Sequence, residues 1–180
     1  MPERITAANI KEVLISENQL QKRIGELADQ IADDYQGKEL LMICILKGAS
    51  AFFVDLTREL GRRDFLGKID FIGKASYGSQ ITSSGEVKTT MSLESEIEGK
   101  DVLVIEDIID TGRTLSQVLE ELSIQNPASL KACVLLDKWE RREVEVDVDY
   151  TGFKIPDKFV VGYYLDYDGD YRGLPYIGVL

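Results

Sequence analysis

Three short apolar runs, each followed by a polar loop or a helical pattern, constrain the fold of this chain most. They are ELLMICIL at 39–46, DVLVIED at 101–107 and LKACVLLD at 130–137. Runs that are apolar throughout are typical of strands in a parallel sheet that helices cover on both faces. We therefore predict an α/β fold with a mostly parallel, twisted sheet.

The expected helices and strands alternate along the chain. Ser16 and Gln19 form a capping-box pattern, and the apolar residues from Leu20 to Ile31 recur at helical spacing. Helices are expected at about 17–35, 51–60 and 115–122, and further strands at 68–76, 86–93, 143–150 and 159–166. The polar stretch YGSQITSSG lies between two of these strands, which predicts a long hairpin with a mobile tip.

Length and composition indicate an ordinary folded protein. At 180 residues the chain is the size of one domain, so we expect a single domain over 1–180. A net charge of −11 without a basic block argues against a protein that binds nucleic acid by neutralising phosphates. The longest apolar run, Leu40 to Leu46, is too short to span a bilayer. We expect a cytoplasmic protein without nucleic-acid or membrane partners, in which Cys44 and Cys133 are buried free thiols.

The stretch VLVIEDIIDTGRTL at 102–115 carries the clearest chemistry. It leads from an apolar run through Glu106 and Asp107 to Asp110 and a loop of Thr, Gly, Arg and Thr. Such loops lie at the carboxyl end of a parallel sheet, where backbone N–H groups and hydroxyls bind phosphate. The loop matches neither the Walker A pattern nor the dinucleotide pattern. Because paired carboxylates suit ribose hydroxyls or a hydrated Mg²⁺, the motif predicts a site for a phosphorylated sugar.

A purely structural interpretation of each acid is also open. Asp110 alone could cap the following helix, and Glu106 and Asp107 could be solvated acids at the end of a strand. This interpretation is weaker for the whole motif, because capping a helix needs only one acid. The chain has no histidine, so a general base in this site must be another side chain.

The motif resembles the signature of type I phosphoribosyltransferases, and its EDIIDTG form resembles their 6-oxopurine branch. The segments LKGAS, KASYGS, LLDK and IPDKFVVGYYLDY occur in the order found in hypoxanthine-guanine phosphoribosyltransferases. The resemblance implies a small hood from the N- and C-terminal segments and a flexible hairpin lid at about 74–88. It also implies transfer of the 5-phosphoribosyl group from 5-phosphoribosyl-1-pyrophosphate to N9 of hypoxanthine or guanine. The products of this purine salvage reaction are IMP or GMP and pyrophosphate.

The resemblance assigns the sugar donor to several separate segments. Glu106 and Asp107 match the acids at the ribose hydroxyls. The 5′-phosphate loop corresponds to Asp110, Thr111, Gly112, Arg113 and Thr114. The pyrophosphate site corresponds to Lys47, Gly48 and Arg172, and in the family a non-proline cis peptide bond precedes the lysine. Mg²⁺ is the implied cofactor, with Glu106, Asp107 and Asp166 as implied ligands, and metal ions with local cations would offset the negative charge of the protein.

The resemblance also assigns the purine site. Asp110 matches the carboxylate that accepts the purine N7 proton, and Lys138 the lysine that donates to the oxygen at C6. A donor there accepts hypoxanthine and guanine and rejects adenine, whose amino group is itself a donor. Phe159 matches the aromatic residue that stacks on the purine, although periodicity alone would place Phe159 in the core. Without the resemblance, Lys138 would be interpreted as a surface lysine. The remaining assignments are Val160 and Asp166 at the base, and Ser76 and Tyr77 in the lid.

Other functions are open from the sequence. The same fold could act preferentially on xanthine, or on adenine or uracil, although Lys138 and Phe159 favour the 6-oxopurines. A nucleotide-sensing regulator that binds RNA or DNA would need a basic face, and no basic run is longer than pairs such as Arg62-Arg63 and Arg141-Arg142. Family members are usually dimers or tetramers, so a homodimer or homotetramer is implied.

Overall fold

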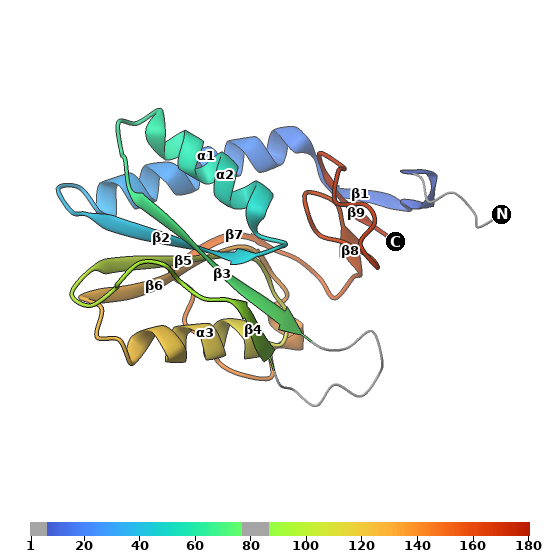
Figure 1. The fold of residues 1–180 in the computed structure, drawn as a ribbon. Coiled ribbons are helices and arrows are strands. Elements are labelled where there is room, and N and C mark those ends of the chain that lie inside the picture. Colours follow the sequence, from blue (N-terminus) through green and yellow to red (C-terminus); the bar gives the residue numbers. More distant parts are fainter. Residues whose placement is uncertain (1–6, 77–86) are drawn as a thin grey trace.

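The structure is a computed structural model that describes residues 7–76 and 87–180, except for the side chains at 75–76 and 87–88 (Figure 1). The helices are α1 Glu17–Asp34, α2 Ser50–Gly61 and α3 Arg113–Ser123, and the short 3-10 turns are η1 Ala7–Asn9 and η2 Trp139–Arg141. The strands are β1 Glu12–Ile15, β2 Leu40–Leu46, β3 Lys68–Ser76, β4 Val87–Met91, β5 Asp101–Ile109, β6 Ser129–Asp137, β7 Tyr150–Lys154, β8 Val160–Val161 and β9 Ile177–Val179.

The central sheet has six strands in the order β4-β3-β2-β5-β6-β7. Neighbouring strands run parallel except β3 and β4, which form an antiparallel hairpin. β2 and β5 lie in the middle of the sheet, and their apolar residues are buried along most of each strand. The predicted mostly parallel sheet is confirmed, and the carboxyl ends of β2, β5 and β6 meet at one edge.

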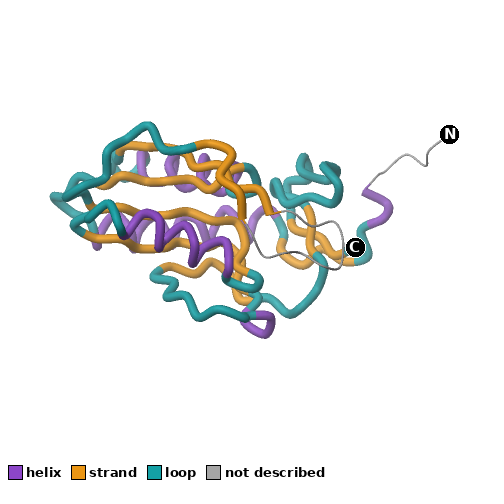
Figure 2. The backbone as a smooth tube through the Cα atoms, turned by 60° about the horizontal axis from the view of Figure 1, so that its bottom comes forward, coloured by secondary structure: helices purple, strands orange, loops and turns teal. Residues whose placement is uncertain are grey.

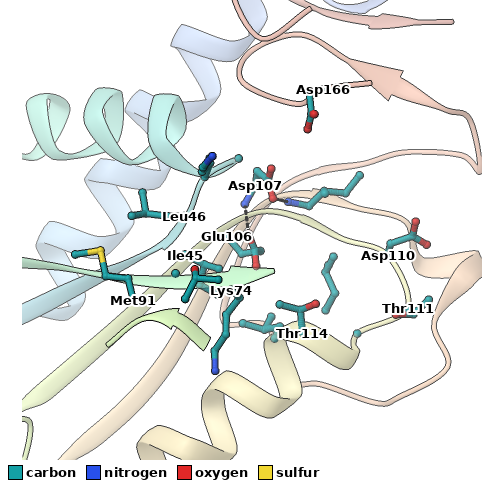
Figure 3. A pocket seen from close by; sticks show the side chains of 18 of the residues that line it. Ile45, Leu46, Lys74, Met91, Glu106, Asp107, Asp110, Thr111, Thr114 and Asp166 are labelled. Carbon is teal, nitrogen blue, oxygen red and sulfur yellow. Dashed lines mark hydrogen bonds between the residues drawn. The ribbon is translucent and has the colours of Figure 1, made fainter. Parts of the chain in front are cut away.

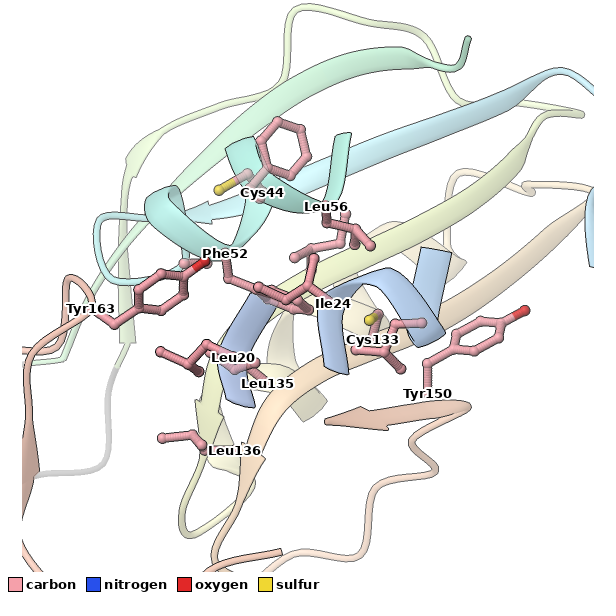
Figure 4. Close-up of a cluster of buried hydrophobic side chains, with 14 of the residues drawn as sticks. Leu20, Ile24, Cys44, Phe52, Leu56, Cys133, Leu135, Leu136, Tyr150 and Tyr163 are labelled. Carbon is pink, nitrogen blue, oxygen red and sulfur yellow. The ribbon is translucent and has the colours of Figure 1, made fainter. Parts of the chain in front are cut away.

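Helices cover both faces of the sheet, with α1 and α2 on one face and α3 on the other (Figure 1). α1 begins at the predicted capping box, in which the Ser16 hydroxyl accepts from the N–H of Gln19 and the Gln19 side chain accepts from the N–H of Ser16. Its buried apolar positions are Leu20, Ile24, Leu27, Ala28 and Ile31. Figure 4 shows side chains of α1 between those of α2 and β6 in the larger core cluster. Each such burial stabilises the fold by about 1.5–3 kcal/mol.

A second sheet of three strands forms the hood beside the large sheet (Figure 1, Figure 2). β1 pairs antiparallel with β9, and β9 pairs antiparallel with β8. The Tyr163 hydroxyl donates to Asp55 Oδ2 on α2 at 2.6 Å, and the Gln21 side chain of α1 donates to the same oxygen at 3.0 Å. Burial, and then this hydrogen bond, raise the pKa of Tyr163. The predicted hood is confirmed, and it is attached to α1 and α2.

The alternating segment at 143–149 is not a strand, contrary to the prediction. The N–H groups of Glu143 and Val144 both donate to the carbonyl oxygen of Thr111, not to a neighbouring strand. Val146 and Val148 pack against the smaller core cluster on the α3 face of the sheet. The alternation therefore reflects packing on one side of an extended segment, and β7 begins only after it.

The strand predicted at 159–166 is reduced to the two residues of β8. The backbone takes positive φ angles of 94°, 50° and 76° at Gly162, Tyr163 and Tyr164. A β-carbon at Gly162 would lie 2.1 Å from the carbonyl oxygen of Tyr176, so only glycine fits at this turn. Valine and tyrosine favour strands, but the contacts within the hood determine the backbone here.

The predicted hairpin is confirmed up to its tip. β3 pairs with β4 from Gly73 opposite Met91 to Ser76 opposite Val87. The tip, which includes Tyr77, lies outside the described residues, as do the side chain of Ser76 and most of the predicted lid at 74–88. The assignment of a lid therefore stays a prediction.

Cys44 and Cys133 are free and buried, as predicted. Burial, followed by the charges of Glu106 and Asp107, raises the pKa of Cys44 to about 12. Burial also raises the pKa of Cys133. Both thiols therefore act as small apolar side chains of the core. Among the helices of residues 7–76 and 87–180, none is long and apolar enough to cross a membrane.

Candidate active site

A cavity of about 1030 Å³ lies at the carboxyl ends of β2 and β5, and the C-terminal segment contributes to its wall. Figure 3 shows Thr114 at the start of α3 and Asp166 on the opposite side, with Glu106 and Asp107 between them. The predicted donor and metal residues that line it are Lys47, Gly48, Glu106, Asp107, Asp110, Thr111, Gly112, Thr114, Asp166 and Arg172. The fold thus brings these separate segments of the sequence to one place.

The loop from Asp110 to Thr114 joins β5 to α3 and forms one wall of the cavity. Gly112 is the N-cap of α3 with a φ of 87°, and a β-carbon there would lie 2.6 Å from the carbonyl oxygen of Val144. Only glycine fits this backbone. Among the described residues, no side chain forms a capping hydrogen bond at the start of α3, so the interpretation of Asp110 as a helix cap is wrong. The first N–H groups of a helix have no carbonyl partner within that helix, so those of α3 can donate to an anion in the cavity.

The turn at Lys47 and Gly48 packs directly against Asp107. The peptide bond between Leu46 and Lys47 is cis, as the family resemblance implied. A β-carbon at Gly48 would lie 1.7 Å from Asp107 Oδ2, which excludes any larger residue without a rearrangement. The backbone of this turn and the Asp107 carboxylate therefore form one continuous surface of the cavity.

Glu106 and Asp107 are neighbouring carboxylates with little compensating charge. Glu106 is 7% exposed, and its Oε1 accepts from the N–H of Asp107 at 3.1 Å. The Oδ1 of Asp107 accepts from the N–H of Ile108 at 2.7 Å, and Figure 3 shows both bonds. Burial, and then the charge of Asp107, raise the pKa of Glu106 well above its ordinary value. Burial also raises the pKa of Asp107, against hydrogen bonds and the charge of Arg172, which lower it.

A cation bound beside these two acids would offset the repulsion between their negative charges. A positive ion beside them would favour their charged forms, which burial disfavours. In the described part of the chain, no group of three or more potential ligand side chains could hold a metal ion alone. Mg²⁺ typically binds one or two protein carboxylates and completes its coordination with water and substrate phosphates. The acids therefore suit Mg²⁺ only together with a phosphorylated ligand.

Asp166 and Arg172 come from the hood and face the cavity as an ion pair. Arg172 Nη2 lies 2.7 Å from Asp166 Oδ1, and Arg172 Nη1 donates to the carbonyl oxygen of Tyr164 at 2.5 Å. The N–H of Gly169 donates to Asp166 Oδ2 at 2.7 Å. These bonds fix both side chains at the wall opposite α3, as Figure 3 shows for Asp166.

Lys138 lies close to Asp110 at the end of β6. It is 5% exposed, and its Nζ lies 3.8 Å from Asp110 Oδ2 and 3.9 Å from Asp157 Oδ1. The interpretation of Lys138 as a surface lysine is therefore wrong. A buried ammonium needs acceptors, and two carboxylates supply them here. Asp110 lines the cavity and Lys138 does not, so the pair combines an acceptor in the cavity wall with a buried donor beside it.

Two exposed aromatic side chains, Phe159 and Tyr167, follow Asp157 in the C-terminal segment. Phe159 is 53% exposed, so the interpretation of Phe159 as a core residue is wrong. Its ring meets that of Tyr167 edge to face, with the ring centroids 5.6 Å apart. Val160 follows on β8 and is 7% exposed. An exposed ring fixed by a neighbouring ring can stack on a planar ligand.

Some residues behave differently from the prediction or were missed. Arg113 does not line the cavity and instead pairs with Glu143 at 2.7 Å. Lys74 lines the cavity and pairs with Glu121 of α3 at 2.5 Å, and its side chain is 1% exposed. Its strand also carries Lys68 and Asp70, so the sequence gives no clear signal for Lys74. Arg141, whose Nε lies 3.1 Å from Asp110 Oδ1, has no clear signal either.

Comparisons with known proteins agree on one family. Residues 12–168 match the phosphoribosyl transferase domain. Over 185 residues the chain is 44% identical to hypoxanthine-guanine phosphoribosyltransferase of Mycobacterium avium, covering 99% of this chain and 90% of that protein. Over 172 residues it is 47% identical to hypoxanthine phosphoribosyltransferase of Escherichia coli, covering 93% of each.

A longer relative and a solved structure extend the comparison. The chain is 48% identical to the bifunctional protein TilS/HprT of Listeria monocytogenes, covering 96% of this chain but only 26% of that protein. A crystal structure of a hypoxanthine phosphoribosyltransferase from Staphylococcus aureus is 44% identical and covers 100% of this chain and 96% of its own. Its TM-score of 0.91 shows that the two folds agree along the whole chain.

Proposed function

The chain belongs to the phosphoribosyltransferase family, and on this premise we propose that it is a hypoxanthine-guanine phosphoribosyltransferase. The enzyme transfers the 5-phosphoribosyl group from 5-phosphoribosyl-1-pyrophosphate to N9 of hypoxanthine or guanine. The observation that carries this proposal is the position of Asp110. It lies between a phosphate-binding loop on one side and the buried Lys138 on the other, so one site offers contacts for a sugar phosphate and a 6-oxopurine.

The sugar donor occupies the cavity in this proposal. The loop from Asp110 to Thr114 and the first N–H groups of α3 bind the 5′-phosphate, because backbone donors attract an anion without any net charge. Glu106 and Asp107 accept hydrogen bonds from the ribose hydroxyls. Lys47, Gly48 and Arg172 bind the pyrophosphate, and the side chains of Lys47 and Arg172 supply two positive charges in the cavity wall.

Asp110 acts as the general base. The N9 lone pair of the purine forms a bond to C1′ of the ribose while the bond from C1′ to the pyrophosphate oxygen breaks and its electron pair leaves with pyrophosphate. The N7 proton becomes more acidic as the new bond forms, and the Asp110 carboxylate accepts it. A carboxylate thus performs the role of the histidine that the chain lacks.

Base selectivity depends on Lys138 in this proposal. Its ammonium donates to the oxygen at C6 of hypoxanthine or guanine. Adenine presents an amino group at that position, which would leave a buried cation facing a donor, and such a mismatch is strongly unfavourable. Phe159 stacks on the purine, and Val160 and Asp166 lie toward its other edge. Ser76 and Tyr77 belong to a segment that would exclude water from the activated sugar.

Mg²⁺ is the cofactor that fits the acids of the cavity. Glu106, Asp107 and Asp166 would hold it together with the oxygens of the donor, and the ion would neutralise charge on the pyrophosphate. This local positive charge, with Lys47 and Arg172, accounts for the binding of an anionic donor by a protein with a net charge of −11. We further propose a cytoplasmic homodimer or homotetramer without nucleic-acid partners.

Turnover with a panel of bases tests the proposal. The purified protein is supplied with the donor, Mg²⁺ and one of hypoxanthine, guanine, xanthine, adenine or uracil, and pyrophosphate release is followed. IMP and GMP are the expected products, with no reaction on adenine or uracil. Preferential turnover of xanthine would change the assigned substrate. Binding of nucleotides without turnover of any base would indicate a sensor and would overturn the enzymatic proposal.

A further inference from the structure

Four charged side chains meet at the purine end of the site. They are Asp110, Lys138, Arg141 and Asp157. Arg141 Nε lies 3.1 Å from Asp110 Oδ1, and Arg141 Nη1 lies 3.6 Å from Asp157 Oδ1. Lys138 Nζ lies 3.8 Å from Asp110 Oδ2 and 3.9 Å from Asp157 Oδ1. Each cation therefore faces both carboxylates.

The two oxygens of Asp110 have different surroundings. Oδ1 is fully buried and accepts no hydrogen bond from the described residues, so its contact with Arg141 is one of charge and not of hydrogen-bond geometry. The side chain as a whole is 37% exposed, so the exposure belongs to its other atoms, which include Oδ2. Of the two carboxylate oxygens, Oδ1 is closed off, which leaves Oδ2 as the one that a ligand could reach. The oxygen that accepts a proton from a bound base must therefore be Oδ2.

We propose that Arg141 is a positioning residue for the base Asp110, and that Asp157 holds Arg141 in place. Arg141 attracts the buried Oδ1, which turns Oδ2 toward the purine. This inference rests on the proposed function, because it needs Asp110 to be the group that accepts the proton. It assigns a role to Arg141, whereas its neighbour Arg142 pairs with Asp137.

The shape of arginine explains why this residue type suits the position. Its guanidinium is planar and presents several donors in fixed directions, so Nε and Nη1 can face two carboxylates at once. Asp157 also matters for charge. The two cations and two carboxylates sum to zero, and after Asp110 accepts a proton Asp157 still neutralises one of the remaining cations. The group of four thus changes by a single charge during the reaction.

A purely structural ion pair would behave differently. Arg141 is 47% exposed and Asp157 is 50% exposed, and pairs this exposed add little to stability. Loss of Arg141 should therefore leave the melting temperature nearly unchanged while it slows turnover. If Arg141 only stabilised the turn at η2, its loss would lower the melting temperature and leave turnover unchanged.

The test compares Arg141→Gln, Arg141→Lys and the matched control Glu140→Gln on the same exposed turn. Arg141→Gln should lower kcat about tenfold and leave the KM for the donor unchanged. This loss is smaller than the whole rate enhancement that a general base supplies. Arg141→Lys should recover part of the loss, and Glu140→Gln should match the wild type. Asp157→Asn should lower kcat about threefold, and because Asp157 also faces Lys138 this variant, unlike Arg141→Gln, should also raise the KM for hypoxanthine.

The decisive measurement places Arg141→Gln in an Asp110→Asn background. If Arg141 acts through Asp110, the second substitution should have no further effect, because the group that it positions is already absent. An independent, multiplicative loss, or a kcat unchanged in Arg141→Gln alone, would overturn the inference while the proposed function stands. A wild-type protein that makes neither IMP nor GMP would overturn the proposed function, and this inference with it.

Discussion

The two ends of the site, which we propose bind the sugar donor and the purine and call the donor end and the purine end, are built in different ways. At the donor end, Gly48 and Gly112 allow backbone to approach Asp107 and Val144 so closely that no β-carbon fits. At the purine end, buried and half-exposed charges meet beside exposed aromatic rings. The first depends on backbone shape and the second on side-chain charge. An added methyl group should therefore disturb the donor end most, and a removed charge the purine end.

Asp110 belongs to both ends, and Asp110→Asn should have the largest effect. The amide cannot accept the purine proton as a carboxylate does, so kcat should fall about a thousandfold with a much smaller change in donor affinity. Steady-state kinetics with hypoxanthine measures both. Asp147→Asn, at an exposed acid outside the site, is the control. An unchanged kcat would reduce Asp110 to a structural residue of the loop.

Gly112→Ala tests the donor end by adding one methyl group. The substitution places a β-carbon at a φ of 87° and 2.6 Å from the carbonyl oxygen of Val144, so the phosphate loop must shift. A displacement of this size should lower kcat/KM for the donor about a hundredfold. Gly61→Ala, where nothing lies within 4 Å, is the matched control. Equal kinetics for the two variants would show that the loop does not bind the phosphate.

Lys138→Ala tests the purine end by removing one charge. The loss of the donor to the C6 oxygen should raise the KM for hypoxanthine about thirtyfold and leave the KM for the sugar donor near the wild-type value. Initial rates with each substrate varied separately distinguish the two. Lys154→Ala, at an exposed lysine at the end of β7, is the control. Equal losses for donor and base would contradict the division of the site into two ends.

Asp70→Asn should affect neither end, and it should change stability alone. Asp70 is 5% exposed and accepts from the N–H groups of Phe71, Glu94 and Ser95 at 2.7, 3.1 and 2.7 Å. Burial acts to raise the pKa of Asp70, but these hydrogen bonds outweigh it and the pKa is lowered from 3.8. We expect the free energy of unfolding to fall by about 2 kcal/mol at pH 7, with kcat unchanged.

The pH dependence of this loss follows from the lowered pKa. A carboxylate with a lower pKa in the folded state stabilises the protein above its unfolded pKa, and the stabilisation disappears as the pH falls through the folded pKa. The difference between wild type and Asp70→Asn should therefore be full at neutral pH and shrink below pH 3.8. Urea unfolding at a series of pH values measures it. A difference that grew toward acid pH would contradict the assigned cause.

The donor end could be predicted from the sequence because most of it is contiguous. The acids, the glycine and the hydroxyls of 106–114 follow one another, and any parallel sheet places such a stretch at the carboxyl end of a strand. The capping box of α1 and the bounds of β3 were predictable for a similar reason, because each depends on neighbouring residues. Local signals of this kind are readable without knowledge of the tertiary contacts.

The purine end could not be predicted in full because its contacts are not local. Arg141 meets Asp110 and Asp157 only after β6 has been placed beside β5, and Arg141 has no unusual sequence context. The same limit explains the two strands predicted wrongly. The segment at 143–149 alternates because it packs on a core cluster, and the turn at Gly162 depends on its contact with Tyr176.

The pairing of β1 with β9 has a consequence for the order of events during translation. Glu12–Ile15 is synthesised before every strand of the large sheet, and its partner Ile177–Val179 is synthesised after all of them. The central strands of the large sheet are complete before β9 leaves the ribosome, whereas β1 has no partner until then. Domains that fold during synthesis form first the parts whose partners are already present. The turn at Lys47 and the loop from Asp110 to Thr114 should therefore assemble first, and the hood, which adds Asp166 and Arg172 to the cavity, should close only once β9 has emerged.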